Sequence, residues 1–306
     1  MNRVTLVCGA GGFIGGTCLP VFDDAGWKVA ASGRGMLGES RRDRPGIPFY
    51  RGDFSDATFA SRMLSEVKPD RVVFLAAPAS VGQSFIDPVA DFRDQTSPFI
   101  QFLECARLTP NPPGVLLVSS AAIYGNPRSI PVPESAAPDP ISPYGFHKLQ
   151  QELLLDEYAK LYGMSTCKAR VFSTYGPGLR HLAVWDIARR AIGRDYTLQG
   201  TGAESRDYLH VSDVARALES ICRHAPFQGE SINVASGVEQ TIEHVADLIY
   251  EAVGAKATPM FEGSQVKGNP VRWRADVQRL AALGFSPRVP FASGIADTVA
   301  WISANA

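Results

Sequence analysis

A tyrosine and a lysine stand four residues apart, as Tyr144 and Lys148, and a serine, Ser120, lies a short way upstream. On a helix, residues four apart project from one face, so the Lys148 ammonium would lie beside the Tyr144 phenol and favour its ionised form. A free phenol has a pKa near ~10, which an ammonium and a positively charged cofactor ring together could bring towards neutrality. The three residues therefore predict proton transfer by Tyr144, with Ser120 holding the oxygen that gains or loses the proton.

The spacing of the tyrosine and the lysine is not specific by itself. It also occurs by chance on surface helices, where an aromatic ring packs on the core beside a solvated lysine stem. The segments that surround the pair must therefore decide between the two interpretations.

The first of these segments is a glycine turn near the start of the chain. An apolar run over 4–8 leads into Gly9-x-x-Gly12-x-x-Gly15, and a helix-like segment follows over 17–25. Such glycines let the backbone approach a pyrophosphate, while the helix that follows offers unpaired N–H groups and the positive end of its dipole. A glycine-rich turn without a ligand is the alternative. Because the turn directly follows a predicted strand and opens a helix, the pattern favours dinucleotide binding.

The first half of the sequence alternates short apolar runs with helix-like segments. Helix-like segments include 57–66 and 97–108, and further apolar runs lie at 28–31, 47–50, 71–77, 114–119 and 166–171. This alternation is typical of a parallel sheet with helices on both faces. We therefore expect an α/β fold with a doubly wound parallel sheet of the Rossmann type.

The composition describes a chain with ample apolar content and almost balanced charge. Its 306 residues are 45% hydrophobic, which suits one large or two modest domains that fold without staples. The 30 basic residues nearly cancel the 31 acidic ones, so we expect neither a nucleic acid nor an anionic membrane as partner. The partner is expected to be a small molecule.

The cysteines and the apolar patterns indicate a cytoplasmic protein. The sequence starts in a strand pattern without the features of a signal peptide, and no apolar run is long enough to span a bilayer. Its five cysteines are odd in number and lie in apolar patterns, so we expect reduced, buried thiols. No cysteine or histidine spacing suits a metal, and none is expected.

The end of the second predicted strand bears on the choice of cofactor. A carboxylate there would accept hydrogen bonds from the adenosine ribose and repel a 2′-phosphate, but the sequence has Ser32, Gly33 and Arg34. Ser32 can donate to such a phosphate and Arg34 can pair with it. An exposed loop arginine without a ligand is the alternative. The segment favours NADP as cofactor, with NAD as the second choice.

Further segments complete a pattern along nearly the whole sequence. They are Gly52-Asp53-Phe54, Leu75-Ala76-Ala77, Ala79-Ser80-Val81, and the runs 119–125, 143–148 and 170–178. With the glycine turn, their order and spacing resemble the extended short-chain dehydrogenase/reductase family, and within it the nucleotide-sugar epimerases, dehydratases and 4-ketoreductases.

The resemblance implies a role for each matched residue. The catalytic residues would be Ser120, Tyr144 and Lys148, with Lys148 also binding the nicotinamide ribose. The cofactor would be bound by Gly9, Gly12, Phe13, Ile14, Gly15, Ser32, Arg34, Asp53, Phe54, Leu75, Ala76, Ala77, Tyr144 and Lys148. The substrate would be bound by Ser80, Ser120, Tyr144, Ser173, Arg206 and Arg272.

The two substrate arginines are assigned to the diphosphate of a nucleotide sugar, the partner that the resemblance implies. A guanidinium can bind phosphate through two parallel hydrogen bonds. Pairing of either arginine with a neighbouring carboxylate is the alternative.

The resemblance also implies two domains and a dimer. The dinucleotide-binding domain would comprise residues 1–172 with about 206–238, and a smaller C-terminal substrate-binding domain would comprise 173–205 and 239–306. The helices at 97–108 and 143–162 could pair with those of a second copy in a homodimer.

Two alanines narrow the reaction. Dehydratases of this family carry an Asp-Glu pair just after the catalytic hydroxyl, because eliminating water needs a further acid and base. Ala121 and Ala122 stand there, which argues against dehydration. Our leading interpretation is NADP-dependent reduction at C4 of a nucleotide-linked 4-keto(-6-deoxy) sugar, with the proton from Tyr144. The alternatives are a nucleotide-sugar 4-epimerase of the UDP-glucose/galactose type with bound NAD, and a dinucleotide-sensing protein without catalysis.

Overall fold

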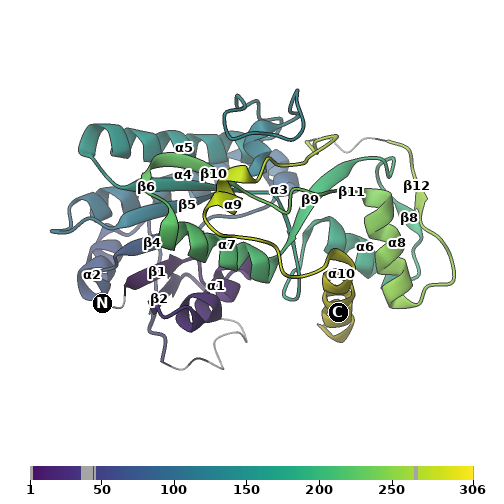
Figure 1. The fold of residues 1–306 in the computed structure, drawn as a ribbon, viewed down its shortest axis with the longest axis horizontal. Helices are drawn as coiled ribbons and strands as arrows, with labels where there is room; N and C mark the ends of the chain where they lie inside the picture. Colours follow the sequence, from purple (N-terminus) through teal and green to yellow (C-terminus); the bar gives the residue numbers. More distant parts are fainter. Residues whose placement is uncertain (1–2, 36–43, 45, 265–267, 306) are drawn as a thin grey trace.

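The computed structural model describes residues 3–35, 44, 46–264 and 268–305, and its centre is a seven-stranded sheet in which every neighbouring pair is parallel (Figure 1). The strand order is β10-β6-β5-β4-β1-β2-β3. These strands are β1 (Val4–Cys8), β2 (Lys28–Gly33), β3 (Phe49–Arg51), β4 (Arg71–Phe74), β5 (Gly114–Ser120), β6 (Thr166–Val171) and β10 (Gln228–Val234). All seven are short, and the central ones are buried almost throughout, as expected where both faces are covered.

Helices cover both faces of this sheet. On one face lie α2 (Ala57–Val67), α4 (Pro88–Arg107) and α5 (Pro143–Tyr162), and on the other lie α1 (Phe13–Asp24) and α7 (Val211–His224) (Figure 1). Each face has its own buried apolar cluster, the first around Phe74 and Phe102 and the second around Phe22 and Leu218. The expected doubly wound α/β fold is confirmed.

The helix that carries Tyr144 begins and ends at clear local signals. The Ser142 hydroxyl accepts a hydrogen bond from the Gly145 amide at 3.2 Å, and Pro143 occupies the first helical position. Gly163 ends the helix in the left-handed conformation at φ 69°. The predicted bounds 143–162 are those observed.

The preceding long helix starts earlier than expected. We predicted 97–108, but α4 begins at Pro88, where the Asp87 carboxylate accepts a hydrogen bond from the Ala90 amide at 2.8 Å. The internal Pro98 interrupts the sequence pattern without ending the helix.

No helix among the described residues is both long enough and apolar enough to cross a membrane.

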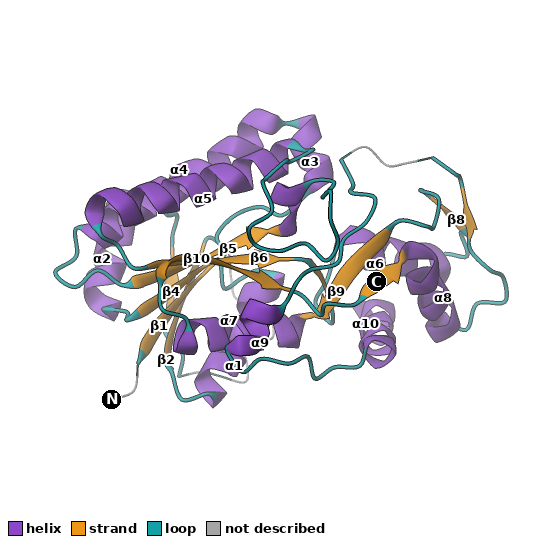
Figure 2. Cartoon of the chain, turned by 45° about the horizontal axis from the view of Figure 1, so that its top comes forward, coloured by secondary structure: helices purple, strands orange, loops and turns teal. Residues whose placement is uncertain are grey.

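A smaller part stands beside the carboxyl ends of the strands (Figure 2). It has a three-stranded sheet in the order β11-β9-β7, a two-stranded sheet and its own apolar cluster around Tyr175 and Ile249. Its elements are β7 (Ser173–Tyr175), α6 (Leu182–Ile192), β8 (Thr197–Leu198), β9 (Ser205–His210), β11 (Glu239–Thr241), α8 (Ile242–Val253), β12 (Met260–Phe261) and α10 (Phe291–Asn305).

The chain crosses between the two parts several times. After β9 it returns to the large sheet as α7 and β10, and α9 (Gln278–Ala282) then packs beside β10. The two-domain division stays a proposal. It assigned residues from about 206 to 238 to the dinucleotide-binding domain, whereas strand pairing groups residues 205–210 with the smaller part. Two short helices, α3 (Val81–Ile86) and the 3₁₀ helix η2 (Ala121–Tyr124), follow β4 and β5.

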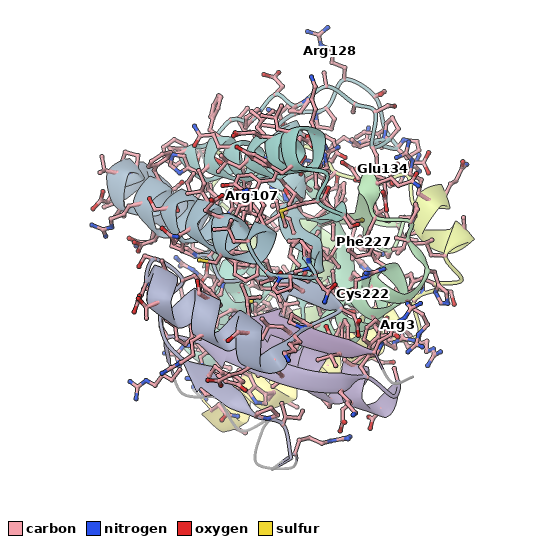
Figure 3. All side chains as sticks on the ribbon, turned by 90° about the vertical axis from the view of Figure 1, so that its left-hand side faces the viewer. Arg3, Arg107, Arg128, Glu134, Cys222 and Phe227 are labelled. Atoms are coloured by element: carbon pink, nitrogen blue, oxygen red, sulfur yellow. The ribbon has the colours of Figure 1, made fainter. Side chains whose placement is uncertain are left out.

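A long loop over 126–142 connects η2 to α5. Val132 forms a β-bridge with Ala275, which ties the loop to the C-terminal segment, whereas Arg128 extends outward at the edge of the molecule (Figure 3). The bridge between Val132 and Ala275 holds the inner part of the loop against the C-terminal segment.

Candidate active site

A cleft of about 1290 Å³ runs between the two parts at the carboxyl ends of the strands. Such an edge is where ligands bind in open α/β sheets. The cleft brings together most of the residues predicted from the sequence, namely Gly9, Gly12, Phe13, Ile14, Gly15, Leu75, Ala77, Ser80, Ser120, Tyr144, Lys148, Ser173 and Arg206. Outside its lining are Ser32, Arg34, Asp53, Phe54, Ala76 and Arg272.

The glycine turn has the geometry that only glycine allows at two positions. Gly9 has φ +87°, in the left-handed region. A Cβ on Gly15 would lie 2.2 Å from the Gly9 carbonyl oxygen, so α1 can approach the turn only without a side chain there. The turn therefore leaves its backbone, and the start of α1, open to the cleft.

The side chains of Ser120 and Tyr144 lie next to each other in the lining of the cleft. Ser120 is the last residue of β5, and Tyr144 lies in the first turn of α5, where its amide donates to the Ser84 hydroxyl at 3.1 Å. The two side chains are hydrogen-bonded to each other, and this bond favours the ionised phenol. The predicted serine and tyrosine are thus within reach of one oxygen of a bound ligand.

Burial outweighs that hydrogen bond in the protein without ligands. It raises the pKa of Tyr144 to about 12, and the negative charge of Asp91 acts in the same direction. Tyr144 is therefore a protonated acid at neutral pH until a positive charge enters the cleft. The expected shift of this pKa towards neutrality is therefore not found in the protein without its cofactor.

Lys148 lies beside Tyr144 and is almost fully buried. Its ammonium is 5.9 Å from the centre of the Tyr144 ring and donates to the Val118 carbonyl at 3.3 Å and to the Gln151 side-chain oxygen at 3.1 Å. Burial lowers the pKa of Lys148 to about 8, although the charges of Asp91 and Glu152 oppose this shift. The sequence predicted the lysine but gave no signal for its hydrogen-bond partner Gln151.

The end of β2 differs from the sequence expectation. The Ser32 side chain is completely buried and its hydroxyl has no hydrogen-bond partner within the described residues, so it does not face a cofactor phosphate. The prediction for Ser32 is corrected, because alternate residues of a strand point to opposite faces. A side chain at Gly33 would instead point at the glycine turn, with its Cβ 3.7 Å from the Gly11 amide.

Arg34 and Asp53 lie next to each other just beyond this strand end. The Arg34 guanidinium is exposed and 3.7 Å from the Asp53 carboxylate. Burial acts to raise the pKa of Asp53, but hydrogen bonds from Ser55 and the Arg34 charge keep it below its ordinary value. Phe54, by contrast, packs its ring against Phe59, Phe74 and Phe102 in the core.

The two predicted substrate arginines have different surroundings. Arg206 is 8% exposed, lines the cleft, and donates to the Ser205 carbonyl at 2.7 Å. Burial lowers the pKa of Arg206, and no carboxylate forms an ion pair with it among the described residues. Arg272 is exposed and makes two bonds of 2.8 Å to the Glu239 carboxylate. Arg272 therefore pairs with a neighbouring carboxylate, which was the alternative to a role in phosphate binding.

Ala122 and Trp273 add apolar and aromatic surface to the cleft, whose lining also holds charged residues such as Arg180, Asp186 and Glu204. Trp273 donates to the Gly125 carbonyl at 2.9 Å, and Ala121 is completely buried. The place of Trp273 at the cleft could not be predicted, because it depends on a contact with residues far away in the sequence. The side chains at 121 and 122 offer no acid or base to a ligand.

Comparison with known proteins identifies the family. The model of the NAD dependent epimerase/dehydratase family matches residues 5–235, which include the glycine turn, Ser120, Tyr144 and Lys148. The chain belongs to this family. A UDP-glucose 4-epimerase from Mycolicibacterium smegmatis is 33% identical over 316 residues, covering 96% of this chain and 97% of the relative.

Solved structures of the epimerase/dehydratase family have the same fold. The UDP-glucose 4-epimerase of Thermus thermophilus in complex with NAD matches with a TM-score of 0.89 and 29% identity, covering 99% of this chain and 100% of that one. The enzyme of Thermotoga maritima with UDP-glucose matches with a TM-score of 0.89 and 27% identity over 99% of each chain.

These matches confirm the predicted family and the expectation of an NAD-dependent enzyme of the short-chain dehydrogenase type. They fit the 4-epimerase alternative better than our leading 4-ketoreductase interpretation, since the relative and both structures are epimerases. The lack of a carboxylate after β2 therefore does not by itself indicate an NADP-dependent reductase.

Proposed function

We propose that this protein is a nucleotide-sugar 4-epimerase that works with a bound dinucleotide. The observation that carries the proposal is the hydrogen-bonded pair Ser120–Tyr144, with Lys148 beside it, in the same cleft as the glycine turn. Proton transfer to and from one sugar oxygen is the chemistry that this group of side chains supports.

The residues of the cleft fit NAD. The glycine turn is a cradle that a Cβ at Gly15 would fill, and the start of α1 presents free amides to a pyrophosphate. Lys148 has donated two of its hydrogen bonds and retains a third for the nicotinamide ribose. When bound, NAD supplies reversible oxidation at C4 of the sugar.

The side chains would act on the C4 oxygen in both directions. Tyr144 takes the proton from the C4 hydroxyl as the carbon is oxidised and returns it when the carbon is reduced on its other face. Ser120 holds that oxygen in place throughout. The Lys148 ammonium stabilises the phenolate that accepts the proton, so no proton needs to leave the cleft.

Neighbouring residues favour epimerisation over the other reactions of this family. Ala121 and Ala122 provide neither acid nor base for the elimination of water. A reductase would need to exchange its cofactor in each turnover, whereas the related Thermus enzyme is an epimerase solved with NAD. NAD is therefore the proposed working cofactor, with NADP accepted at Arg34 because no carboxylate at residue 33 repels a 2′-phosphate.

The proposed substrate is a nucleoside diphosphate sugar. Arg206 is a buried guanidinium that donates to the Ser205 carbonyl through one nitrogen, so it retains several donors for an anion entering the cleft. The Thermotoga epimerase, solved with UDP-glucose, supports a uridine nucleotide. Ser80 and Ser173 line the same cleft and would bind sugar hydroxyls.

We further propose a homodimer formed through α4 and α5. Large apolar side chains are exposed on these two helices, namely Val89, Phe92, Ile100, Phe146, Leu153 and Leu161. Their burial against a second copy would remove apolar surface from water. Sedimentation of the purified protein would give twice the chain mass if this is correct.

The function is tested by incubating the protein and NAD with UDP- and dTDP-linked glucose, galactose and N-acetylglucosamine, and with a dTDP-linked 4-keto-6-deoxy sugar. We expect NMR to detect interconversion of C4 epimers for at least one 4-hydroxy sugar, without net use of cofactor. In a parallel incubation with NADPH, turnover of the 4-keto sugar alone, with matching oxidation of NADPH, would instead establish the reductase.

A further inference from the structure

We propose that Gln151 is a positioning residue for Lys148, and that together with Asp91 it forms a buried polar connection that keeps the catalytic ammonium charged and in place. The proposal rests on the proposed function, because that function gives Lys148 its role. It concerns the side of the lysine that faces away from the cleft.

The connection starts at the ammonium itself. Lys148 donates to the side-chain oxygen of Gln151, one helical turn further along α5, at 3.1 Å. The Gln151 side-chain nitrogen donates in turn to the backbone carbonyl of Gln95, on α4, at 2.7 Å. Since Gln151 is completely buried and both ends of its amide are bonded, its orientation is fixed, and so is the acceptor that it presents to the ammonium.

Gln95 also contacts a carboxylate, through its side chain rather than through the backbone carbonyl that binds Gln151. The Gln95 side-chain nitrogen donates to Asp91 at 2.7 Å, and His147 contacts the same carboxylate oxygen at 2.5 Å. Asp91 is 7% exposed, and Gln95 is completely buried. The negative charge of Asp91 favours protonation of both Lys148 and Tyr144, although neither of them is bonded to it.

Other charged groups near the lysine are already paired. Glu152, on α5, forms an ion pair with Arg170 of β6, with a shortest distance of 2.8 Å. From β5, the lysine contacts the neutral Val118 carbonyl. Asp91 is thus the carboxylate near Lys148 that no arginine or lysine neutralises among the described residues, and the titratable group bonded to it is His147.

The lysine needs this support because it is buried. Burial lowers the pKa of Lys148 to about 8, so the ammonium is retained at neutral pH with little margin. An acceptor dipole at 3.1 Å and a carboxylate behind it both oppose the loss of the proton. Removing either one should lower the pKa of Lys148 without changing any residue that lines the cleft.

The test measures the titration of Lys148 directly by NMR on the full-length protein with carbon-13 in the lysine side chains. A Lys148→Arg variant assigns the signal. We expect a wild-type midpoint near pH 8, a midpoint about one unit lower in Gln151→Met, and a shift in the same direction in Asp91→Asn. Gln151→Glu should raise the midpoint, because a carboxylate replaces the amide oxygen.

Gln150→Met is the matched control, since Gln150 is the exposed neighbour on the same helix. An unchanged Lys148 midpoint in Gln151→Met, equal to that of the control, would overturn the proposal. If Gln151→Met does not fold, the opposite shifts expected for Asp91→Asn and Gln151→Glu decide the question, and equal midpoints in those two variants overturn it.

The measurement separates this proposal from the proposed function. The titration needs neither substrate nor turnover, so it can succeed even if the protein epimerises nothing. Where turnover is observed, Gln151→Met should lose activity at lower pH than the wild type on the alkaline side. Substrate KM should change less than kcat, because Gln151 does not line the cleft.

Discussion

The guanidinium of Arg206 stacks on the ring of Trp273, with 5.6 Å between the guanidinium carbon and the ring centre. Both residues line the cleft, and both are at most 9% exposed. Stacking holds the planar cation without using its hydrogen-bond donors, which a carboxylate partner would do. The proposed phosphate contact therefore falls to Arg206, whereas Arg272 is already bound to Glu239.

The two arginines should differ in their effect on nucleotide binding. We expect Arg206→Met to weaken binding of UDP by about 10- to 100-fold, the amount expected for hydrogen bonds to a charged group. The matched variant Arg272→Met should change the affinity by less than about twofold, because Arg272 lies outside the cleft lining. Calorimetry on both variants measures this, and equal losses would show that the assignment is wrong.

Replacing Tyr144 by phenylalanine should remove the proton transfer while leaving the ligands bound. We expect kcat to fall by about 10²- to 10⁴-fold, with nearly unchanged UDP affinity. Tyr158→Phe is the control, because Tyr158 lies on the same helix but donates to Glu104, away from the cleft. Full activity of Tyr144→Phe would contradict the role given to the phenol.

The buried Lys148 should cost the protein stability at neutral pH. Its pKa is about 8 in the folded protein against an ordinary value of 10.5, so the unfolded chain binds more protons between these values. The unfolding free energy must therefore rise with pH between about 8 and 10.5. Below pH 8 the full cost of the buried charge applies, about 3 kcal/mol.

Lys148→Met removes that cost, so we expect the variant to be more stable than the wild type at pH 7. The difference should shrink as pH rises from 8 towards 10.5. Urea unfolding of both proteins at several pH values measures it. A difference that does not depend on pH would show that the lysine is not held in a low-dielectric site.

Arg34 should influence one cofactor only. We expect Arg34→Met to weaken binding of NADP by about tenfold, the loss of one charge-assisted contact, and to leave binding of NAD unchanged. The 63% exposure of its side chain keeps the effect modest. Titration with both dinucleotides tests this, and an equal loss for the two would mean that Arg34 does not contact a 2′-phosphate.

Local signals explain which parts of the fold could be predicted. Ser142, Pro143 and Gly163 mark the ends of α5 in the sequence itself, so its bounds were correct. The strands β1 and β6 were likewise predicted to the residue, β1 as a mainly apolar run and β6 with Lys168 and Arg170 alternating with smaller residues. The glycine turn is local too, and its spacing reflects contacts between residues only a few positions apart.

Contacts between distant residues explain what could not be predicted. The partner of Gln151 on α4 is 56 residues away, and the partner of Arg272, Glu239, is 33 residues away, so spacing reveals neither. The burial of Ser32 was not predicted because a short run of small residues does not show which side of the strand is buried. Residue spacing and family resemblance together indicated the candidate catalytic residues, but neither showed how these residues pack.

The most direct test of the central claim uses nucleotide sugars that carry deuterium at C4. The protein is incubated with NAD and each labelled 4-hydroxy sugar of the panel, and the product is analysed by NMR. Epimerisation by oxidation and reduction within one cleft predicts that the C4 epimer retains its deuterium in nearly every molecule. Loss of the deuterium from C4, or conversion that forms NADH in equal amount, would contradict this account.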